Sequence, residues 1–365
     1  MRALVTGAGG FLGKHLTYAL RAQGVQVDGF LRGDCPAHLE ALCRTADVVY
    51  HLAGVNRAED AREFERGNVH TAQQLTQTLR RVGNACPVVV SSSVQATLPT
   101  PYGVSKRESE RIFLQYGQES GASVRLLRLP GVFGKWCRPH YNSVVATFCH
   151  DASRSLPLCV HEPQRELELL YVDDAIRALI DAAGQPGAGY GATPAPYRIR
   201  VDALAAQIED FCALQPTAHL PQLAPGSLQA RLYATYLSYL PPTALCVALQ
   251  PHADERGSFC ELLRSAAGGQ VSVNVTLPGQ SRGGHWHGSK WEMFFVVGGQ
   301  GEVLLRRVGA NEELRFAVDG RQPCAIRIPP GCVHRLINRS DGAMTTVIWA
   351  SEEFDAQRPD TYKEE

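Results

Sequence analysis

The sequence predicts an α/β half, built on a doubly wound parallel sheet, followed by an all-β barrel. From residue 1 to about residue 180, short β-branched runs alternate with longer segments whose apolar residues recur at three- and four-residue spacing, the pattern of a parallel sheet covered by helices. From about residue 247, short alternating runs are separated by Gly and Pro, which predicts a sandwich or barrel. Because 365 residues exceed what one core usually serves, we expect two domains, residues 1–246 and 247–365.

The strand and helix patterns can be placed along the chain. In the first half, strands are expected at Ala3–Thr6, Asp47–Leu52, Val88–Ser92 and Ser123–Arg128, and helices at Gly13–Gln23, Val69–Val82 and Val201–Leu214. The composition of Gly184–Gly191 predicts a loop, which we place near a substrate site. In the second half, strands are expected at Val271–Thr276, Phe294–Val297, Glu302–Arg306, Ala325–Ile328 and Met344–Trp349.

Composition excludes several classes of partner. The 36 basic and 36 acidic side chains give zero formal net charge, so there is no electrostatic case for nucleic acid or an anionic membrane. No apolar run is long enough to cross a bilayer, and the N-terminus lacks the pattern of a secretory signal. The 11 Cys are scattered without CxxC pairs, as expected of reduced thiols. We therefore expect a cytoplasmic protein without membrane insertion.

A glycine-rich turn follows the first predicted strand. Thr6–Gly13 reads T-G-x-x-G-x-x-G, and glycine there lets backbone amides approach a pyrophosphate at a helix N-terminus. A tight turn opening an ordinary helix is the alternative, but the position at the start of an α/β pattern favours a Rossmann-type dinucleotide site. The predicted cofactor-binding residues of this turn are Gly7, Gly10, Phe11, Leu12 and Gly13.

The second predicted strand, near Val25–Leu31, should end at the residue that selects between NAD and NADP. Asp28 would bind a ribose 2′-hydroxyl, whereas Arg32 would accommodate a 2′-phosphate. Arg32 falls nearer the expected strand end, which favours NADPH. A solvated loop charge remains the alternative for Arg32.

Tyr102 and Lys106 form a Y-x-x-x-K pattern that places both side chains on one helical face. The lysine would lower the phenol pKa and hold the cofactor ribose, so Tyr102 would donate a proton to a carbonyl. The pattern alone is common on solvated helices. Here the hydroxyl run Ser91–Ser93 ends the preceding strand and could orient the substrate oxygen, which together predicts a reductase site.

These motifs resemble the extended short-chain dehydrogenase/reductase family. The matching stretches, in order, are Asp47–Gly54, Ser93, Pro101–Lys106, Arg128–Gly134 and Tyr171–Asp174. The resemblance implies that Ser93, Tyr102 and Lys106 are catalytic. It also implies that Leu52, Ala53 and Gly54 lie beside the cofactor, that Lys106 contacts it, and that the substrate is a nucleotide-sugar.

The second half carries a metal-binding pattern. His285 and His287 would point to one face of a strand, Glu292 would return on the next strand, and His334 would come from a later one. The spacing resembles the cupin signature, although Pro323 stands where a glycine is expected. Any one histidine alone would more simply be a core or surface residue. The set of four predicts a divalent ion such as zinc, while iron, manganese or nickel would also accept these ligands.

The whole chain resembles the bifunctional reductases of capsular polysaccharide synthesis in the UDP-N-acetyl-L-fucosamine pathway. The stretches that carry this resemblance are His51–Arg57, Phe133–Cys149, Tyr236–Pro241 and Phe354–Tyr362, and Asp254–Phe259 resembles the opening of cupin-type epimerases. The resemblance implies C3 epimerisation of a UDP-4-keto-6-deoxy-N-acetylhexosamine in the cupin, then NADPH reduction at C4 to UDP-N-acetyl-6-deoxy-L-talosamine. It also implies a homodimer.

Several points stay open at the level of sequence. Lys290 is a candidate acid or base of the epimerase, but a solvated charge is the simpler interpretation of that residue. The metal is either catalytic or structural. Two other functions compete: a 4-epimerase that retains its NAD beside a passive cupin, and a non-catalytic sensor of nucleotides or sugars. The sugar configuration and any channelling between domains are also undetermined.

Overall fold

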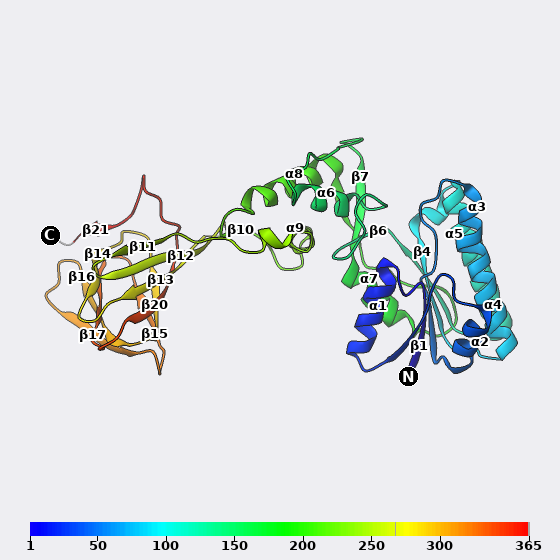
Figure 1. Cartoon of the computed structure of the whole chain (residues 1–365), viewed down its shortest axis with the longest axis horizontal. Helices are drawn as coiled ribbons and strands as arrows, with labels where there is room; N and C mark the ends of the chain where they lie inside the picture. The colour runs from blue at the N-terminus through cyan, green and yellow to red at the C-terminus, as the bar shows by residue number, and fades with distance from the viewer. Residues whose placement is uncertain (267, 364–365) are drawn as a thin grey trace. The chain divides into compact units, whose positions relative to one another are not determined.

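The chain forms two compact units in the computed structural model, which describes residues 1–266 and 268–363 (Figure 1). The first unit contains Met1–Asp210 and Gly226–Pro241. The second contains Phe211–Pro225 and the described chain from Pro242 onwards. Each unit has its own sheets, so they are described separately.

The first unit is built on a six-stranded parallel sheet in the order β2-β1-β3-β4-β5-β8. Its strands are β1 (Arg2–Thr6), β2 (Gln26–Phe30), β3 (Val48–His51), β4 (Val88–Ser93), β5 (Val124–Leu129) and β8 (Ala188–Tyr190). The central strands β3 and β4 are almost wholly buried because helices cover both faces of the sheet. The strand order reverses between β1 and β3, which is where such sheets bind ligands.

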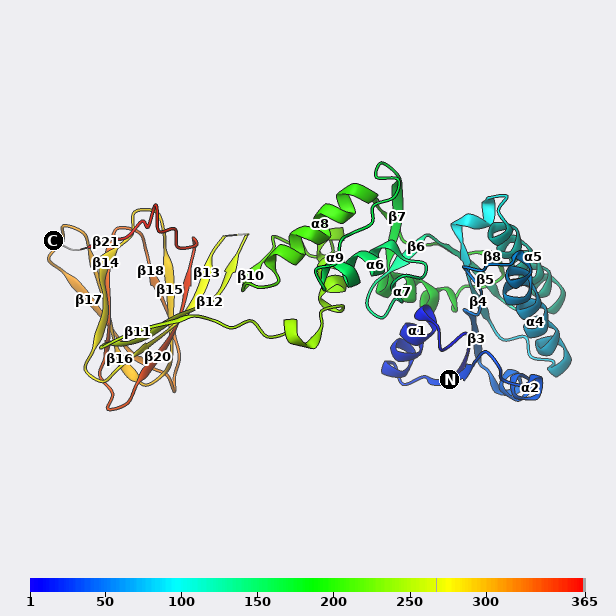
Figure 2. The ribbon, with the colours of Figure 1, turned by 45° about the horizontal axis from the view of Figure 1, so that its top comes forward.

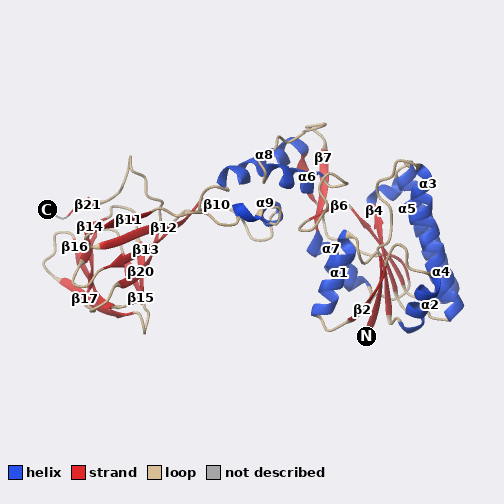
Figure 3. Ribbon diagram, in the orientation of Figure 1, coloured by secondary structure: helices blue, strands red, loops and turns tan. Residues whose placement is uncertain are grey.

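Helices cover the two faces in two groups (Figure 3). The helices are α1 (Phe11–Ala22), α2 (Pro36–Thr45), α3 (Ala61–Phe64), α4 (Thr71–Val82), α5 (Pro101–Ser120), α6 (Val144–Ala152), α7 (Val172–Ala182), α8 (Val201–Leu214) and α9 (Leu228–Leu237), with a π-helix η1 at Glu65–His70 and a short 3₁₀ turn η2 at Val94–Thr97. A further 3₁₀ turn, η3 at Pro242–Ala244, belongs to the second unit. Leu16 and Leu179 join α1 and α7 in one core. Leu39, Leu75 and Phe113 join α2, α4 and α5 in the other.

Two features of this unit differ from the expectation. The predicted loop Gly184–Gly191 contains β8, which pairs with β5 at the sheet edge. Gly191, which follows β8, lies so close to β5 that a Cβ there would be 3.2 Å from the Leu127 side chain. A small second sheet, which was not predicted, has the order β6-β7-β9. Its strands are β6 (Gly131–Phe133), β7 (Glu166–Tyr171) and β9 (Tyr197–Arg200).

The second unit is an all-β barrel of two sheets (Figure 2). One sheet has the order β10-β12-β13-β20-β15-β18 with β11 beside β12, and the other has the order β17-β16-β19-β14-β21. The strands are β10 (His219–Leu220), β11 (Pro251–Asp254), β12 (Gly257–Ser265), β13 (Gln270–Thr276), β14 (Ser281–Trp286), β15 (Glu292–Gly298), β16 (Gln300–Arg307), β17 (Glu313–Asp319), β18 (Ala325–Ile328), β19 (Cys332–Asn338), β20 (Met344–Ala350) and β21 (Tyr362–Lys363).

Alternating burial along β13 and β15 turns every second side chain into the barrel. Phe294, Val303, Leu336 and Met344 form its apolar core. The predicted combination of a Rossmann-type parallel sheet with a C-terminal all-β barrel is therefore confirmed. Among the described residues, no helix has the length and apolar character needed to span a bilayer.

Candidate active sites

The glycine-rich turn between β1 and α1 is sterically fixed. Gly7 has a φ of +72°, and a Cβ there would lie 2.7 Å from the Ala53 nitrogen. A Cβ at Gly13 would lie 2.1 Å from the Gly7 carbonyl oxygen. Gly10 caps α1, which starts with Phe11 and Leu12, both half-buried. The turn therefore leaves the first amides of α1 free to receive a phosphate.

The segment after β3 lies directly beside this turn. The Leu52 amide donates to the Thr6 carbonyl at 3.1 Å, and Ala53 follows it. Gly54 packs so closely on Asn68 that a Cβ would meet its Oδ1 at 2.8 Å. Asn68 was not predicted from the sequence, although it is buried in η1 and donates from Nδ2 to the Ser105 hydroxyl at 2.9 Å. It thus ties the segment to α5.

The two candidates for cofactor selection occupy different places. Asp28 lies in the middle of β2, paired with Leu4. Arg32 follows the end of β2 by two residues and is exposed. Arg32 is therefore at the strand end, where a ribose 2′-substituent is recognised in this fold.

The structure brings Ser93, Tyr102 and Lys106 together. Ser93 ends β4, and Tyr102 and Lys106 lie in the first two turns of α5. The α5 N-terminus is set by Thr100, whose hydroxyl accepts from the Gly103 amide at 3.1 Å. Lys106 is buried and donates from Nζ to the Ser91 carbonyl at 2.8 Å. The three side chains thus share one position at the carboxyl end of the sheet.

Burial is the largest influence on the pKa values of Tyr102 and Lys106. It lowers the pKa of Lys106 to about 8, with the nearby Glu110 carboxylate opposing the shift. It raises the pKa of Tyr102, and a hydrogen bond with Ser93 opposes that shift. The expectation that Lys106 lowers the Tyr102 pKa is therefore not met, because desolvation of the phenol prevails and the ammonium is directed at Ser91.

An ion pair between Arg128 and the buried Glu110 lies beside these residues and was not predicted. Glu110 is 2% exposed and accepts two hydrogen bonds from Arg128, from Nε at 2.9 Å and from Nη2 at 2.6 Å. Ser92 also donates to Glu110, at 2.5 Å. Burial raises the Glu110 pKa, but the Arg128 and Ser92 hydrogen bonds outweigh it, so the net shift is downward. This pair joins β4, α5 and β5 next to Ser93, Tyr102 and Lys106.

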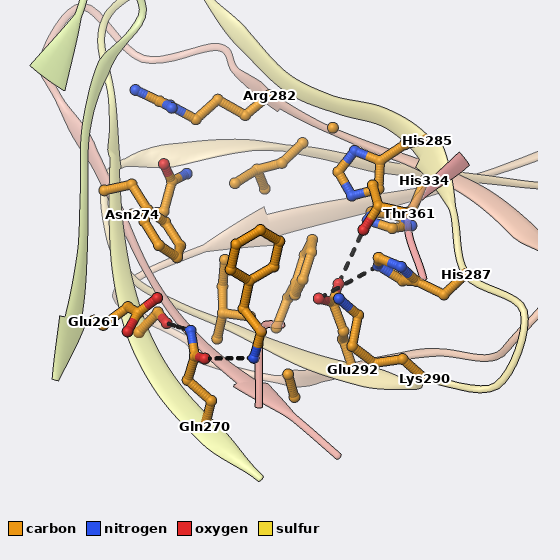
Figure 4. Close-up of a pocket in the computed structure, with 18 of the residues that line it drawn as sticks. Glu261, Gln270, Asn274, Arg282, His285, His287, Lys290, Glu292, His334 and Thr361 are labelled. Atoms are coloured by element: carbon orange, nitrogen blue, oxygen red, sulfur yellow. Dashed lines mark hydrogen bonds and ion pairs between the residues drawn. The ribbon is translucent and has the colours of Figure 1, made fainter. Parts of the chain in front are cut away.

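The four predicted metal ligands meet in one pocket of the barrel (Figure 4). The imidazole donor atoms of His285, His287 and His334 all lie within 4.8 Å of one another. The two Glu292 oxygens lie 3.5 Å from His287 Nε2 and 3.4 Å from His334 Nε2. Ligands placed tetrahedrally at about 2.0–2.2 Å from zinc are separated by about 3.3–3.6 Å. The two separations between Glu292 and the histidines therefore fit such an ion, and the three imidazole donors are gathered within 4.8 Å.

The protonation of the imidazoles also fits a metal. Burial lowers the pKa of His285 to about 4 and lowers that of His334, so both rings are neutral near pH 7. The Nε2 atom of His287 is buried and has no hydrogen-bond partner among the described residues. An unsatisfied buried nitrogen costs stability unless a ligand binds it. The orphaned atom is therefore consistent with metal ligation.

Two residues at this pocket change the expectation from sequence. Lys290 is 7% exposed and lines the pocket, so the interpretation as a solvated charge is wrong. Its turn is held by Asp360, whose carboxylate accepts from the amides of Gly288, Ser289 and Lys290 at 2.8, 3.0 and 2.8 Å. No local pattern predicts this contact, because about 70 residues separate the partners.

The pocket is large enough for a sugar ring, with a cavity of about 500 Å³. Glu261, Gln270, Asn274 and Arg282 supply polar groups on the wall away from the four predicted ligands (Figure 4). The Asn274 Oδ1 is buried without a partner among the described residues. Such a mixed wall suits a polar ligand with many hydroxyls.

Comparison with known proteins agrees with the division of the chain into a Rossmann-type unit and an all-β unit. Residues 3–192, more than half of the chain, match the NAD dependent epimerase/dehydratase family. The chain belongs to this family. Residues 252–362 match the polysaccharide biosynthesis C-terminal domain.

Similar proteins cover the whole chain. A UDP-2-acetamido-2,6-beta-L-arabino-hexul-4-ose reductase of Pseudomonas aeruginosa is 37% identical over 99% of this chain and 98% of its own length. The crystal structure of the capsular polysaccharide assembling protein CapF from Staphylococcus aureus is 37% identical, with a TM-score of 0.91 over 100% of both chains. MoeE5 in complex with UDP-glucose and NAD, 22% identical with a TM-score of 0.56, covers 65% of this chain and 98% of its own and shows the fold alone. The resemblance to the two-domain capsular polysaccharide proteins is confirmed.

Proposed function

We propose that this chain is a bifunctional nucleotide-sugar enzyme. The barrel epimerises C3 of a UDP-4-keto-6-deoxy-N-acetylhexosamine, and the first unit then reduces the C4 ketone with NADPH to give UDP-N-acetyl-6-deoxy-L-talosamine. The observation that carries the proposal is that one chain holds both a Ser93–Tyr102–Lys106 set and a buried three-histidine, one-glutamate pocket. The Pseudomonas relative named as a hexul-4-ose reductase aligns with both units, which supports the assignment.

Reduction uses the residues at the end of β4 and the start of α5. NADPH, held by the glycine-rich turn and Lys106, would supply the hydride for C4. Tyr102 donates its phenolic proton to the C4 oxygen, and Ser93 donates a hydrogen bond that orients the same oxygen. Lys106, one turn further along α5, would hold the cofactor ribose, as the family resemblance implies. Arg32, exposed beyond β2, would pair with the 2′-phosphate of NADPH.

Epimerisation uses the barrel pocket. A proton at C3 is acidic only while C4 is a ketone, because its removal gives an enolate. A divalent ion held by His285, His287, Glu292 and His334 would supply a positive charge for the enolate oxygen. Lys290, buried in the same wall, is placed to transfer the C3 proton. Inversion needs a second group on the opposite side, where Glu261 offers a carboxylate (Figure 4).

The order of steps follows from the same chemistry. Once the C4 ketone is reduced, the C3 proton loses its acidity and the configuration is fixed. Epimerisation therefore precedes reduction. The barrel must act on the ketone that the first unit consumes.

Separate variants of the two sites test the proposal. Tyr102→Phe should lower the rate of NADPH oxidation by about 10²- to 10⁴-fold, the usual size of a lost general acid, while exchange of the C3 proton continues. Glu292→Gln should stop the exchange. Tyr18→Phe, an exposed tyrosine of α1, serves as the control. Unchanged NADPH oxidation in Tyr102→Phe would overturn the reductase assignment.

A second candidate is a 4-epimerase that retains its NAD, favoured by the epimerase/dehydratase description of the family. That enzyme returns the hydride to the same sugar. Measured consumption of NADPH distinguishes the two, because the proposed reductase oxidises one NADPH per sugar and the 4-epimerase oxidises none.

A further inference from the structure

A second group of metal-type ligands lies in the first unit, away from its catalytic set. His140 belongs to the loop between β6 and α6, whereas His150 and Asp151 lie in the last turns of α6. His140 Nε2 and His150 Nδ1 lie 3.0 and 2.9 Å from the same oxygen, Asp151 Oδ1. The two nitrogens are 3.4 Å apart. Three donor atoms thus converge on one point.

The backbone holds this convergence in place. His140 has a φ of +54°, a left-handed conformation that non-glycine residues adopt at a cost. Its amide donates to the Thr147 hydroxyl on α6 at 3.0 Å, so the loop is fixed against the helix that carries the other two ligands. The His140 side chain stays exposed, while its Nε2 atom lies 3.0 Å from Asp151 Oδ1.

The charge balance of the group calls for a cation. The Asp151 residue is only 9% exposed, and within the described part of the chain its ion-pair partners are these two imidazoles, with no Lys or Arg. A buried carboxylate is costly unless a positive charge lies beside it. A divalent ion accepts one lone pair from each ring and from the carboxylate, and it removes that cost.

We propose that His140, His150 and Asp151 bind a divalent transition-metal ion of the zinc class. Two imidazoles and one carboxylate suit zinc, cobalt or nickel better than magnesium or calcium, which prefer oxygen ligands. The present donor separations of 2.9–3.4 Å need to open by only a few tenths of an ångström to surround an ion at about 2.0–2.2 Å. The remaining coordination positions face the exposed side of His140 and take water. The ion joins the loop to α6.

Metal counting on the full-length protein tests this site. The protein is stripped with a chelator and titrated with Zn²⁺, and bound zinc per chain is measured after removal of free ion. The wild type should bind two ions, one in the barrel and one here. His140→Ala and Asp151→Asn should each bind one fewer ion, and His70→Ala, another exposed histidine of this unit, should bind as the wild type does.

Thermal unfolding provides a second readout that does not depend on catalysis. Added Zn²⁺ should raise the unfolding midpoint of the first unit in the wild type but not in His140→Ala, whose circular dichroism should match the wild type because its side chain is exposed. A variant carrying His285→Ala and His334→Ala should still bind one ion. Equal zinc stoichiometry in wild type and His140→Ala would overturn the proposal and leave an ordinary histidine–aspartate pair.

Discussion

His287 donates a hydrogen bond from Nδ1 to the main-chain carbonyl of Asp360, with 2.6 Å between the two atoms. This bond places the ring hydrogen on Nδ1 and leaves the lone pair on Nε2, the atom that faces Glu292. The carboxylate of Asp360 at the same time holds the turn that carries Lys290. One residue of the C-terminal segment therefore orients a predicted metal ligand and the proposed proton-transfer group.

We expect Asp360→Ala to loosen metal binding in the barrel. The substitution removes four hydrogen bonds from the 288–290 turn next to His287. The loss of such supporting contacts typically weakens metal affinity about 10- to 100-fold. The rate of zinc transfer to a chromogenic chelator measures the effect. Asp355→Ala, an exposed residue of the same segment, is the matched control. Equal release rates would mean that the segment does not support the ion.

The pH dependence of reduction should report Lys106. Its pKa of about 8 in the free protein means that the ammonium is charged below pH 8 and loses its proton above it. Because the charged form is the active one, kcat/KM for the cofactor should fall as pH rises through 8. Tyr102 does not account for this limb, since its pKa is raised. In Lys106→Arg the limb should disappear, and its persistence there would contradict the assignment.

Arg32→Ala should change the choice of cofactor. A charge-assisted hydrogen bond is worth about 1.5–3 kcal/mol, so the Kd for NADPH should rise about 10- to 100-fold. The Kd for NADH, which lacks the 2′-phosphate, should change little. Fluorescence titration of both cofactors measures this, with Arg21→Ala at the exposed end of α1 as the control. Parallel weakening of both cofactors would show that Arg32 does not recognise the phosphate.

Arg128→Met should destabilise the first unit. It leaves the buried Glu110 carboxylate without its cationic partner, which costs up to about 3–5 kcal/mol. Arg111→Met breaks a comparable ion pair with Glu108 on the exposed surface of α5 and should cost no more than about 1 kcal/mol. Urea unfolding of the two variants gives the comparison. A similar loss of unfolding free energy in the two variants would mean that the Arg128–Glu110 pair contributes no more than a surface ion pair.

The sequence predicted elements whose signal is local. The strand predicted at Val88–Ser92 is observed as β4, Val88–Ser93. A continuous β-branched run predicts a buried strand from local sequence alone. The Y-x-x-x-K spacing of Tyr102 and Lys106 likewise depends only on helical geometry. The spacing of His285 and His287 needs only an extended backbone.

The missed features depend on contacts between distant segments. Asn68 is hydrogen-bonded to Ser105, and Glu110 is paired with Arg128. Lys290 lies in a turn that Asp360 holds by a hydrogen bond to the Lys290 amide. Hydrophobic periodicity does not predict such pairs, because each partner taken alone has the pattern of an ordinary polar surface residue. The strand β8 was missed for a related reason, because its glycine-rich composition resembles a loop until β5 lies beside it.

Proton NMR in deuterated buffer tests the central claim most directly. The metal-loaded protein is incubated with a UDP-4-keto-6-deoxy-N-acetylhexosamine, first without and then with NADPH. We predict loss of the C3 proton signal before any cofactor is added, followed by conversion to the 4-hydroxy sugar once NADPH is present. Reduction without any prior exchange at C3 would contradict the account and leave the protein a simple reductase with a non-catalytic barrel.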